Sequence, residues 1–175
     1  MPQWNNTMPN IPTLNTGRLV LRPFVEEDVY VLLDIMDDAE VMRYFPNPVP
    51  MTLERAQLFL KKQTDEWAKT DYGHWGVVLN DALVGWCGLQ FLPETKENEV
   101  AYCLAKDTWG KGFATEAAQA SVNYGFNQLG MKEIIGLTHL KNIASQNVLR
   151  KVGMRFDARL VYWGMECMRF KVSKT

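Results

Sequence analysis

The order of the predicted elements indicates an α/β (α+β) fold in which helices cover both faces of one mixed sheet. Three β-prone segments follow one another between residues 75 and 105, which is the pattern of a meander. Helical and β-prone segments then alternate after residue 112. A chain of 175 residues that is 47% hydrophobic can bury one substantial core. We therefore expect a single domain over residues 16–175, preceded by a flexible tail over the Pro- and Asn-rich residues 1–15.

The first half of the chain predicts a strand, two helices and the meander. Arg18–Phe24 has an apolar, β-prone centre, and the acidic residues that follow can open a helix with apolar positions at the 3.6-residue period. Three prolines in Tyr44–Pro50 require a loop, after which Thr52 can cap a second helix. Asn80-Asp81 favours a tight hairpin turn. The strands of the meander are expected at Trp75–Leu79, Leu83–Leu92 and Glu99–Ala105.

The second half of the chain predicts two helices that alternate with strands. Small residues recur at helical spacing from Gly112 to Leu129, so this helix can lie close to the sheet, and Gly130 stops it. The remaining elements are a strand at Ile134–Leu140, a helix at Ile143–Val152 ended by Gly153, and two closing strands at Met154–Leu160 and Tyr162–Val172.

Charge and cysteine usage argue against several classes of protein. The 19 Lys and Arg residues against 20 Asp and Glu give no broad basic field for nucleic acid. Cys87, Cys103 and Cys167 lack a Cys-x-x-Cys spacing and fit a reducing compartment, and His74 and His139 lack the spacing of metal ligands. The sequence shows neither a signal-peptide pattern nor an apolar run long enough for a membrane span. We expect a cytoplasmic protein with a small-molecule ligand and no metal, membrane or nucleic-acid partner.

The segment Trp109–Glu116 opens the small-faced helix and is rich in glycine. Glycines let a backbone approach a ligand, and the first amides of a helix can bind a pyrophosphate. Lys111 adds a positive charge. The segment is not a Walker loop, because Gly112 stands where that motif needs Ser or Thr, and Thr115 replaces the third glycine of a dinucleotide-binding loop. By spacing alone, an anion site and a flexible turn before a helix both fit.

The loop and three further segments resemble the GNAT superfamily of N-acetyltransferases, and within it the branch of ribosomal-protein N-acetyltransferases (RimJ/RimL-like). The loop is similar to that branch's pattern Trp-Gly-x-Gly-Tyr/Phe-Ala-Thr-Glu. Thr16–Pro23, Glu99–Tyr102 and Asn142–Met154 match in the same order. The leading Gln or Arg of the wider superfamily motif is replaced by Asp107. The resemblance implies a mostly antiparallel mixed sheet that is splayed between its fourth and fifth strands, with acetyl-CoA in the gap.

The resemblance also implies how the cofactor is held. Pantetheine is expected to pair with the backbone near Tyr102 to Leu104, while the pyrophosphate meets the amides of Gly110 to Thr115. Asn142 is expected to hold the pantetheine arm from the other side. The expected cofactor-binding residues are Tyr102, Cys103, Leu104, Trp109, Gly110, Lys111, Gly112, Phe113, Ala114, Thr115, Asn142, Ser145, Asn147 and Lys151.

Acetyl transfer from acetyl-CoA to an amine needs few catalytic groups. An aliphatic amine is mostly protonated at neutral pH and must lose a proton before it attacks, so a carboxylate base is useful. Glu99 is the candidate base, since many relatives carry a catalytic Glu in this region; the alternative is a solvated strand-end carboxylate. Many relatives carry a Tyr that acts as the general acid seven residues after the Asn that corresponds to Asn142. This chain has Leu149 at that position. Ser145 is the available hydroxyl, either as general acid or as an ordinary first-turn helix residue.

The resulting prediction is direct transfer of an acetyl group from acetyl-CoA to a primary amine, on a protein N-terminus or a small molecule. The alternative is a non-catalytic acyl-CoA sensor. The loop Tyr44–Pro50 can form a lid or substrate wall, and Cys103 is expected to be a packed thiol rather than a nucleophile. A monomer and a homodimer both fit. Residues that either line an acceptor pocket or belong to the core are Trp75, Trp86, Trp163, Met42, Tyr44 and Phe45.

Overall fold

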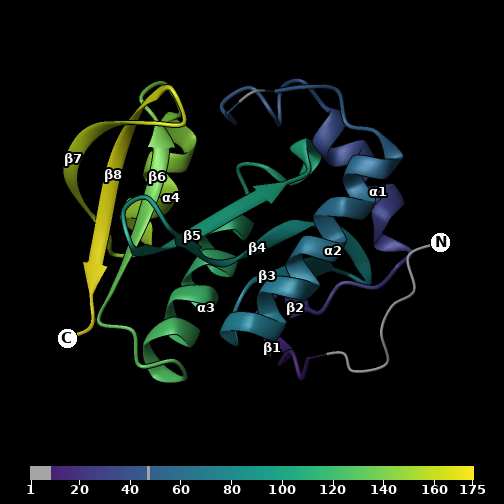
Figure 1. Cartoon of the computed structure of the whole chain (residues 1–175), viewed down its shortest axis with the longest axis horizontal. Coiled ribbons are helices and arrows are strands. Elements are labelled where there is room, and N and C mark those ends of the chain that lie inside the picture. Colours follow the sequence, from purple (N-terminus) through teal and green to yellow (C-terminus); the bar gives the residue numbers. More distant parts are fainter. Residues whose placement is uncertain (1–8, 47) are drawn as a thin grey trace.

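The computed structural model describes residues 9–46 and 48–175, and one eight-stranded sheet runs through this part of the chain (Figure 1). The strands lie in the order β1-β2-β3-β4-β5-β6-β8-β7. Neighbouring strands are antiparallel except β5 and β6, which are parallel. The predicted mixed, mostly antiparallel sheet is confirmed. The strands are β1 (Leu14–Asn15), β2 (Val20–Arg22), β3 (His74–Leu79), β4 (Ala82–Leu92), β5 (Glu97–Leu104), β6 (Glu133–His139), β7 (Arg155–Tyr162) and β8 (Met165–Ser173).

The helices of the described residues begin and end close to the predicted positions. Thr52 caps the second helix, its hydroxyl oxygen accepting a hydrogen bond from Arg55 N at 3.3 Å. Asn80 and Asp81 take positive φ angles of 49° and 65°, which forms the tight turn between β3 and β4. The helices are α1 (Asp28–Asp37), α2 (Leu53–Thr70), α3 (Phe113–Asn127) and α4 (Ile143–Lys151), with a short 3-10 helix at Lys106–Thr108.

Two boundaries differ from the sequence-based expectation. Part of the expected tail is ordered, because β1 pairs with β2 and Trp75 Nε1 donates a hydrogen bond to Pro12 O at 2.7 Å. Residues 1–8 of that tail lie outside the described residues. The closing hairpin turns at Trp163-Gly164, with φ angles of 48° and 74°, rather than at Val161. Gly164 adopts a positive φ at no steric cost, which allows a tight turn here. Strand β7 therefore continues to Tyr162, the residue before the turn.

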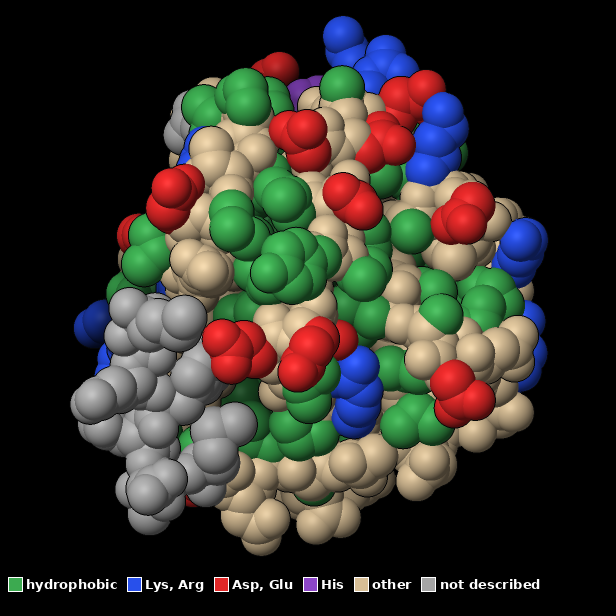
Figure 2. Space-filling model, turned by 90° about the vertical axis from the view of Figure 1, so that its right-hand side faces the viewer, with side chains coloured by type: hydrophobic (Ala, Val, Ile, Leu, Met, Phe, Trp, Pro, Cys, Tyr) green, Lys and Arg blue, Asp and Glu red, His purple; other side chains and the backbone are tan. Residues whose placement is uncertain are grey.

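Helices cover both faces of the sheet, as predicted (Figure 1). Two successive residues of β4 show the alternation of a strand. Trp86 packs in the cluster that includes α1 and α2, whereas Cys87 packs beneath α3, with its Sγ 3.4 Å from Ser121 Oγ. On the side of the molecule seen in Figure 2, acidic side chains are scattered among apolar ones, so the described part of this face offers no continuous basic surface.

The sheet is splayed between β5 and β6, which are the strands expected on either side of the gap. Their labels are one higher than predicted because β1 is an additional strand. The two strands pair where Glu99 lies opposite Ile135 and then diverge toward their carboxyl ends (Figure 1). Parallel neighbours normally continue their hydrogen bonds along the strand. The backbone of both strands beyond this pair is therefore turned toward an opening in the middle of the sheet.

Candidate functional site

The glycine-rich loop links the end of β5 to the start of α3. Trp109 Nε1 donates a hydrogen bond to Leu104 O at 2.9 Å, which fastens the loop to the strand. Gly110 and Gly112 have φ angles of 75° and 83°, a left-handed conformation that favours glycine. No side chain among the described residues caps α3, so its first backbone amides keep their capacity to bind an anion.

Arg18 and Glu116 support this loop, and sequence reasoning did not single them out. Arg18 Nη1 donates to the carbonyl oxygen of Lys111 at 2.9 Å, and its guanidinium carbon lies 4.4 Å from the centre of the Phe113 ring. Arg18 Nε also donates to Glu116 Oε2 at 2.8 Å. Burial raises the pKa of Glu116, but hydrogen bonds from Thr16 and Arg18 outweigh this effect and lower it. Both residues lie in matched segments, which is the signal that could have found them.

Lys111 turns away from the helix terminus. Its ammonium group donates to the carbonyl oxygen of Asp107 at 2.9 Å, and its side chain is exposed. A depression of about 620 Å³ borders the loop at Phe113 and is otherwise lined by residues 15–20 and by Leu79 and Asn80. It lies apart from the gap between β5 and β6, so we do not assign the reaction to it.

The backbone of β5 alternates between β4 and the gap. Ala105 N donates to Val84 O at 2.8 Å, so the residue two positions earlier, Cys103, also turns its polar groups toward β4. A Cβ atom on Gly85 would lie 2.1 Å from Cys103 O, which agrees with this direction. Tyr102 and Leu104 therefore face the gap, and the Leu104 carbonyl already accepts from the Trp109 indole. Cys103 was expected among the cofactor-binding residues, but its backbone polar groups face β4 and not the gap.

The Cys103 thiol is a packed side chain. It is 4% exposed and belongs to the cluster formed with α1 and α2. Burial raises the pKa of Cys103 to about 12, so the thiol stays protonated at neutral pH and is a poor nucleophile.

Glu99 occupies the point where the two strands separate. Its carboxylate accepts hydrogen bonds from Gln90 Nε2 at 2.6 Å and from Leu137 N at 3.2 Å. The backbone amide of Leu137 would otherwise continue the ladder between β6 and β5, so the carboxylate stands in the place of a strand. Glu99 is 4% exposed, and this burial raises its pKa to about 7 against the opposing effect of both hydrogen bonds. The alternative of a solvated carboxylate does not fit this geometry.

The raised pKa of Glu99 gives a prediction for stability. A carboxyl group whose folded-state pKa of about 7 lies above its unfolded value of 4.5 contributes stability that is fully present below pH 4.5, and this contribution is lost progressively as pH rises from 4.5 to about 7. The expected loss is about 3 kcal/mol of unfolding free energy relative to Glu99→Gln, whose amide cannot ionise. Urea denaturation of both proteins at pH 5 and pH 8.5 measures it. An equal difference between the two proteins at both pH values would show that Glu99 does not titrate in this range.

The first turn of α4 faces β5 across the gap. Asn142 caps α4, its side-chain oxygen accepting from Ser145 N at 3.1 Å. The Tyr102 hydroxyl lies 2.8 Å from Ser145 Oγ and donates to Ser145 O at 3.2 Å. Burial raises the pKa of Tyr102. The structure thus brings Tyr102, Asn142 and Ser145 together around the gap.

The rest of α4 contributes less to the gap. Asn147 and Lys151 are exposed, and Asn147 Oδ1 accepts a hydrogen bond from Arg150 Nη1 at 3.2 Å. Leu149 is 1% exposed and packs in the core, where it would contact a Cβ atom added to Gly136 at 2.5 Å. The position of the expected family tyrosine is therefore filled by a packing residue.

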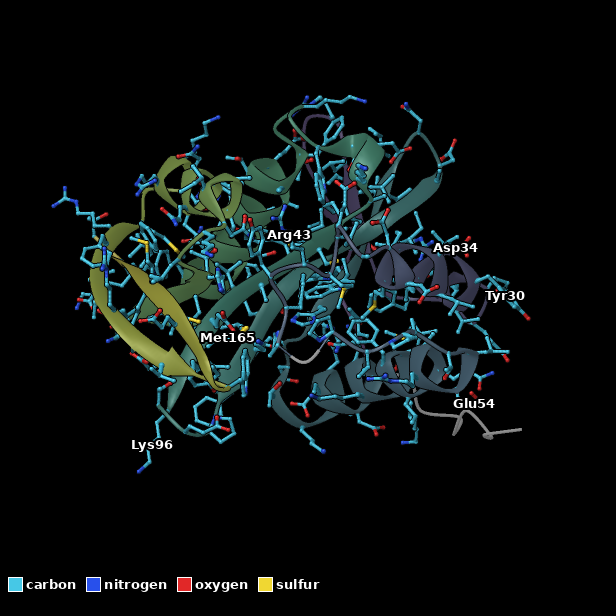
Figure 3. All side chains as sticks on the ribbon, turned by 90° about the horizontal axis from the view of Figure 1, so that it is seen from above. Tyr30, Asp34, Arg43, Glu54, Lys96 and Met165 are labelled. Carbon is cyan, nitrogen blue, oxygen red and sulfur yellow. The ribbon has the colours of Figure 1, made fainter. Side chains whose placement is uncertain are left out.

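The aromatic candidates for an acceptor pocket divide between two faces. Tyr44 stacks on His139 with ring centroids 5.2 Å apart, and Phe45 contacts Trp86 with centroids 6.2 Å apart. By the alternation of the strands, these contacts lie on the same face of the sheet as the Glu99 carboxylate. Arg43, next to Tyr44, lies between the helices α1 and α2 and the strands β6 to β8 when seen from above (Figure 3). The loop after α1 thus reaches across to β6.

The other candidates lie elsewhere. Trp75 is fully buried on the opposite face, Trp163 is half exposed at the closing hairpin, and Met42 packs against the cluster beneath α1. His74 stacks on Trp86 with centroids 4.6 Å apart, and burial lowers its pKa to about 3. The described residues contain no group of His, Cys, Asp or Glu side chains that could hold a metal ion. None of the described helices is long and apolar enough to cross a membrane.

Known proteins are similar to this chain in sequence and in fold. The family model described as "Acetyltransferase (GNAT) domain" matches residues 18–155. The chain is 30% identical over 152 residues to the uncharacterized N-acetyltransferase p20 of Bacillus licheniformis, covering 85% of each chain. It is 25% identical over 144 residues to spermidine N(1)-acetyltransferase of Escherichia coli, covering 81% of this chain and 75% of that protein. A structure of RimL, a ribosomal L7/L12 alpha-N-protein acetyltransferase in complex with coenzyme A, superimposes with a TM-score of 0.79 at 17% identity, covering 93% and 97% of the two chains.

Proposed function

The chain belongs to the GNAT family of acetyltransferases and transfers an acetyl group from acetyl-CoA to an amine, and we propose that the thioester lies in the gap between β5 and β6 with Glu99 as the base. The observation that carries this proposal is the single described pair between the two strands, Glu99 opposite Ile135. Beyond it, the gap-facing backbone of Tyr102 and Leu104 lies between the glycine-rich loop and α4. A peptide-like pantetheine arm can occupy the place of the missing strand.

The two ends of the gap fit the other parts of the cofactor. Pyrophosphate carries negative charge, and the uncapped amides at the start of α3 provide donors at the positive end of the helix dipole. Gly110 and Gly112 let the loop backbone approach it. On the opposite side, the Asn142 side-chain amide can donate to a pantetheine carbonyl while its oxygen caps α4.

The transfer needs a base and an oxyanion donor. We assign the base to Glu99, acting directly or through one water, because a carboxyl pKa of about 7 suits removal of a proton near neutral pH. The amine nitrogen then attacks the thioester carbon. The developing oxyanion can accept a hydrogen bond from a gap-facing amide of Tyr102 or Leu104, since the amide of Cys103 is turned toward β4.

The acceptor approaches from the face that carries the Glu99 carboxylate. The walls available there are the Tyr44 and His139 stack and the contact between Phe45 and Trp86. Spermidine N(1)-acetyltransferase acts on a small amine and RimL on a protein N-terminus, so both classes of primary amine remain acceptors in this proposal. No feature of the site favours a non-catalytic acyl-CoA sensor. A sensor would have no use for a carboxylate whose pKa is about 7.

The proposal is tested by cofactor binding and by turnover. Coenzyme A at a hundredfold excess over its dissociation constant should stabilise the folded protein by about 2.7 kcal/mol, measured by thermal or urea unfolding. Thiol release from acetyl-CoA should depend on an added amine, in a panel of polyamines, aryl amines and peptides with free N-termini.

A matched pair of variants tests the loop. Gly112→Ala places a Cβ atom 3.4 Å from Arg18 at a positive φ, so it should weaken coenzyme A binding about tenfold. Gly130→Ala has a similar positive φ with nothing within 4 Å and should leave the affinity unchanged. Equal affinities of both variants would remove the loop from the site, and absence of turnover with every amine at full cofactor occupancy would contradict the enzymatic proposal.

A further inference from the structure

Two hydroxyl groups meet at the gap on the face covered by α3 and α4, and a third lies on the same face of β6. The Tyr102 hydroxyl reaches from β5 to Ser145 of α4, lying 2.8 Å from its Oγ. Thr138 of β6 follows Ile135 by three residues, as Tyr102 follows Glu99, so the side chains of Thr138 and Tyr102 lie on the same face of the sheet. Thr138 is 5% exposed, and its hydroxyl has no hydrogen-bond partner among the described residues. A buried polar group without a partner is costly, which points to a polar occupant of the gap.

We propose that the Tyr102 hydroxyl donates the hydrogen bond that stabilises the sulfur of coenzyme A as it leaves, and that Ser145 holds the phenol in place. This inference rests on the proposed function. Leu149, at the position where relatives carry a tyrosine, cannot supply a donor. Ser145 precedes Leu149 by four residues, which is one turn on the same side of α4. The phenol of Tyr102 thus reaches the helix face from which a tyrosine at 149 would project, but from the opposite wall of the gap.

The transfer replaces the carbon–sulfur bond of the thioester with a carbon–nitrogen bond. The amine nitrogen forms a bond with the acetyl carbon, and the carbon–sulfur bond breaks with its electron pair passing to sulfur. The ammonium proton passes to Glu99 before the attack and from there to water, and the second proton, which the nitrogen loses after the attack, takes the same route. The thiolate charge is stabilised by the Tyr102 O–H while it forms, and the sulfur takes a proton from water after it leaves.

Tyr102 is a better donor than Ser145 for this purpose. A phenol is the more acidic hydroxyl and makes the stronger hydrogen bond to an anion. Burial raises the pKa of Tyr102, so the phenol keeps its proton at neutral pH and remains a donor. In the protein without cofactor the Tyr102 O–H donates to the Ser145 carbonyl oxygen, and we expect it to turn from that oxygen to the sulfur while the Ser145 hydroxyl donates to the phenol oxygen and holds it in place.

The kinetic test compares Tyr102→Phe with Ser145→Ala. Loss of one hydrogen bond to a charged group should lower kcat about 10- to 100-fold in Tyr102→Phe, with the amine KM unchanged. Ser145→Ala should lower kcat only about threefold, since the phenol keeps the proton that it donates to the sulfur and loses only the hydrogen bond that orients it. Tyr124→Phe is the matched control, because its hydroxyl donates to Asp71 O far from the gap. A larger loss in Ser145→Ala than in Tyr102→Phe would make Ser145 the donor and overturn the inference.

A binding test does not depend on turnover. The ratio of affinities for coenzyme A and for desulfo-coenzyme A should rise with pH as the thiol ionises near roughly 8.5, because Tyr102 stabilises the bound thiolate. The rise should be about tenfold smaller in Tyr102→Phe. The same rise in both proteins would refute the role of Tyr102, whereas a wild-type protein that binds no coenzyme A would refute the proposed function itself.

Discussion

Replacing Glu99 by Gln is expected to lower kcat by about 10²- to 10⁴-fold, while coenzyme A affinity stays within about twofold of the wild type. The amide can keep both observed contacts, since its oxygen can accept from Leu137 N and its nitrogen can donate to the Gln90 side-chain oxygen. The variant therefore removes the base and leaves the hydrogen-bonded side chain between β5 and β6 in place. Steady-state kinetics with the best acceptor amine, together with calorimetric cofactor binding, measure the two quantities.

The pH dependence separates the chemical role of Glu99 from a structural one. In the wild type, kcat/KM should fall as pH decreases through about 7, because the base becomes protonated. Glu99→Gln should lack this decline. Glu97→Gln is the matched control, as Glu97 lies two residues earlier on the same face and forms an ion pair with Arg169. If Glu99→Gln keeps the wild-type rate, or if Glu97→Gln loses as much, Glu99 is not the base.

Replacing Gly85 by Ala is expected to cost about 2–5 kcal/mol of unfolding free energy. The φ angle of Gly85 is 147°, and a Cβ atom there would lie 2.1 Å from Cys103 O and 2.8 Å from Leu104 Cα. Relief of this contact must push β5 away from β4 beside the proposed thioester position. Urea denaturation measures the stability, and coenzyme A affinity should fall in the same variant.

Gly130→Ala is the control for the backbone conformation alone. Its φ angle of 65° is also positive, but a Cβ atom there has nothing within 4 Å, so we expect a cost of only about 1 kcal/mol. Equal costs for Gly85→Ala and Gly130→Ala would show that the close approach of β4 to β5 does not constrain the site.

The arrangement of elements could be predicted because its signals are local. Thr52 marks the start of α2, Asn80-Asp81 marks the hairpin, and the small-residue stripe marks α3. Each of these patterns acts through neighbours within about one turn or one hairpin. The position of the closing hairpin turn differs from the prediction because Trp163 takes a positive φ, a conformation that is uncommon for a bulky residue.

The environment of the candidate base could not be predicted in the same way. Glu99 follows the charged residues Glu94, Lys96 and Glu97, which favour a solvated segment. Its burial depends on β6, whose Leu137 amide lies 38 residues away in sequence. The direction of the Cys103 backbone depends on the register with β4, and no local pattern encodes that register.

The contacts that tie the site together are also distant in sequence. Arg18 and Glu116 are 98 residues apart, and Tyr102 and Ser145 are 43 residues apart. Family resemblance brought Tyr102 and Ser145 to the same region but gave them separate roles. Only the structure shows that their hydroxyls touch.

The divergence of β5 and β6 gives the protein two open strand edges in the centre of its sheet. Exposed edges are sites where a strand from another chain can add, and proteins usually cover or interrupt them. Here the contact between Tyr102 and Ser145 closes one face, and the stack of Tyr44 on His139 lies over the other. If the cofactor binds as proposed, we expect this opening to be where the protein without cofactor is most susceptible to aggregation, and the bound cofactor to protect it by filling the missing strand position.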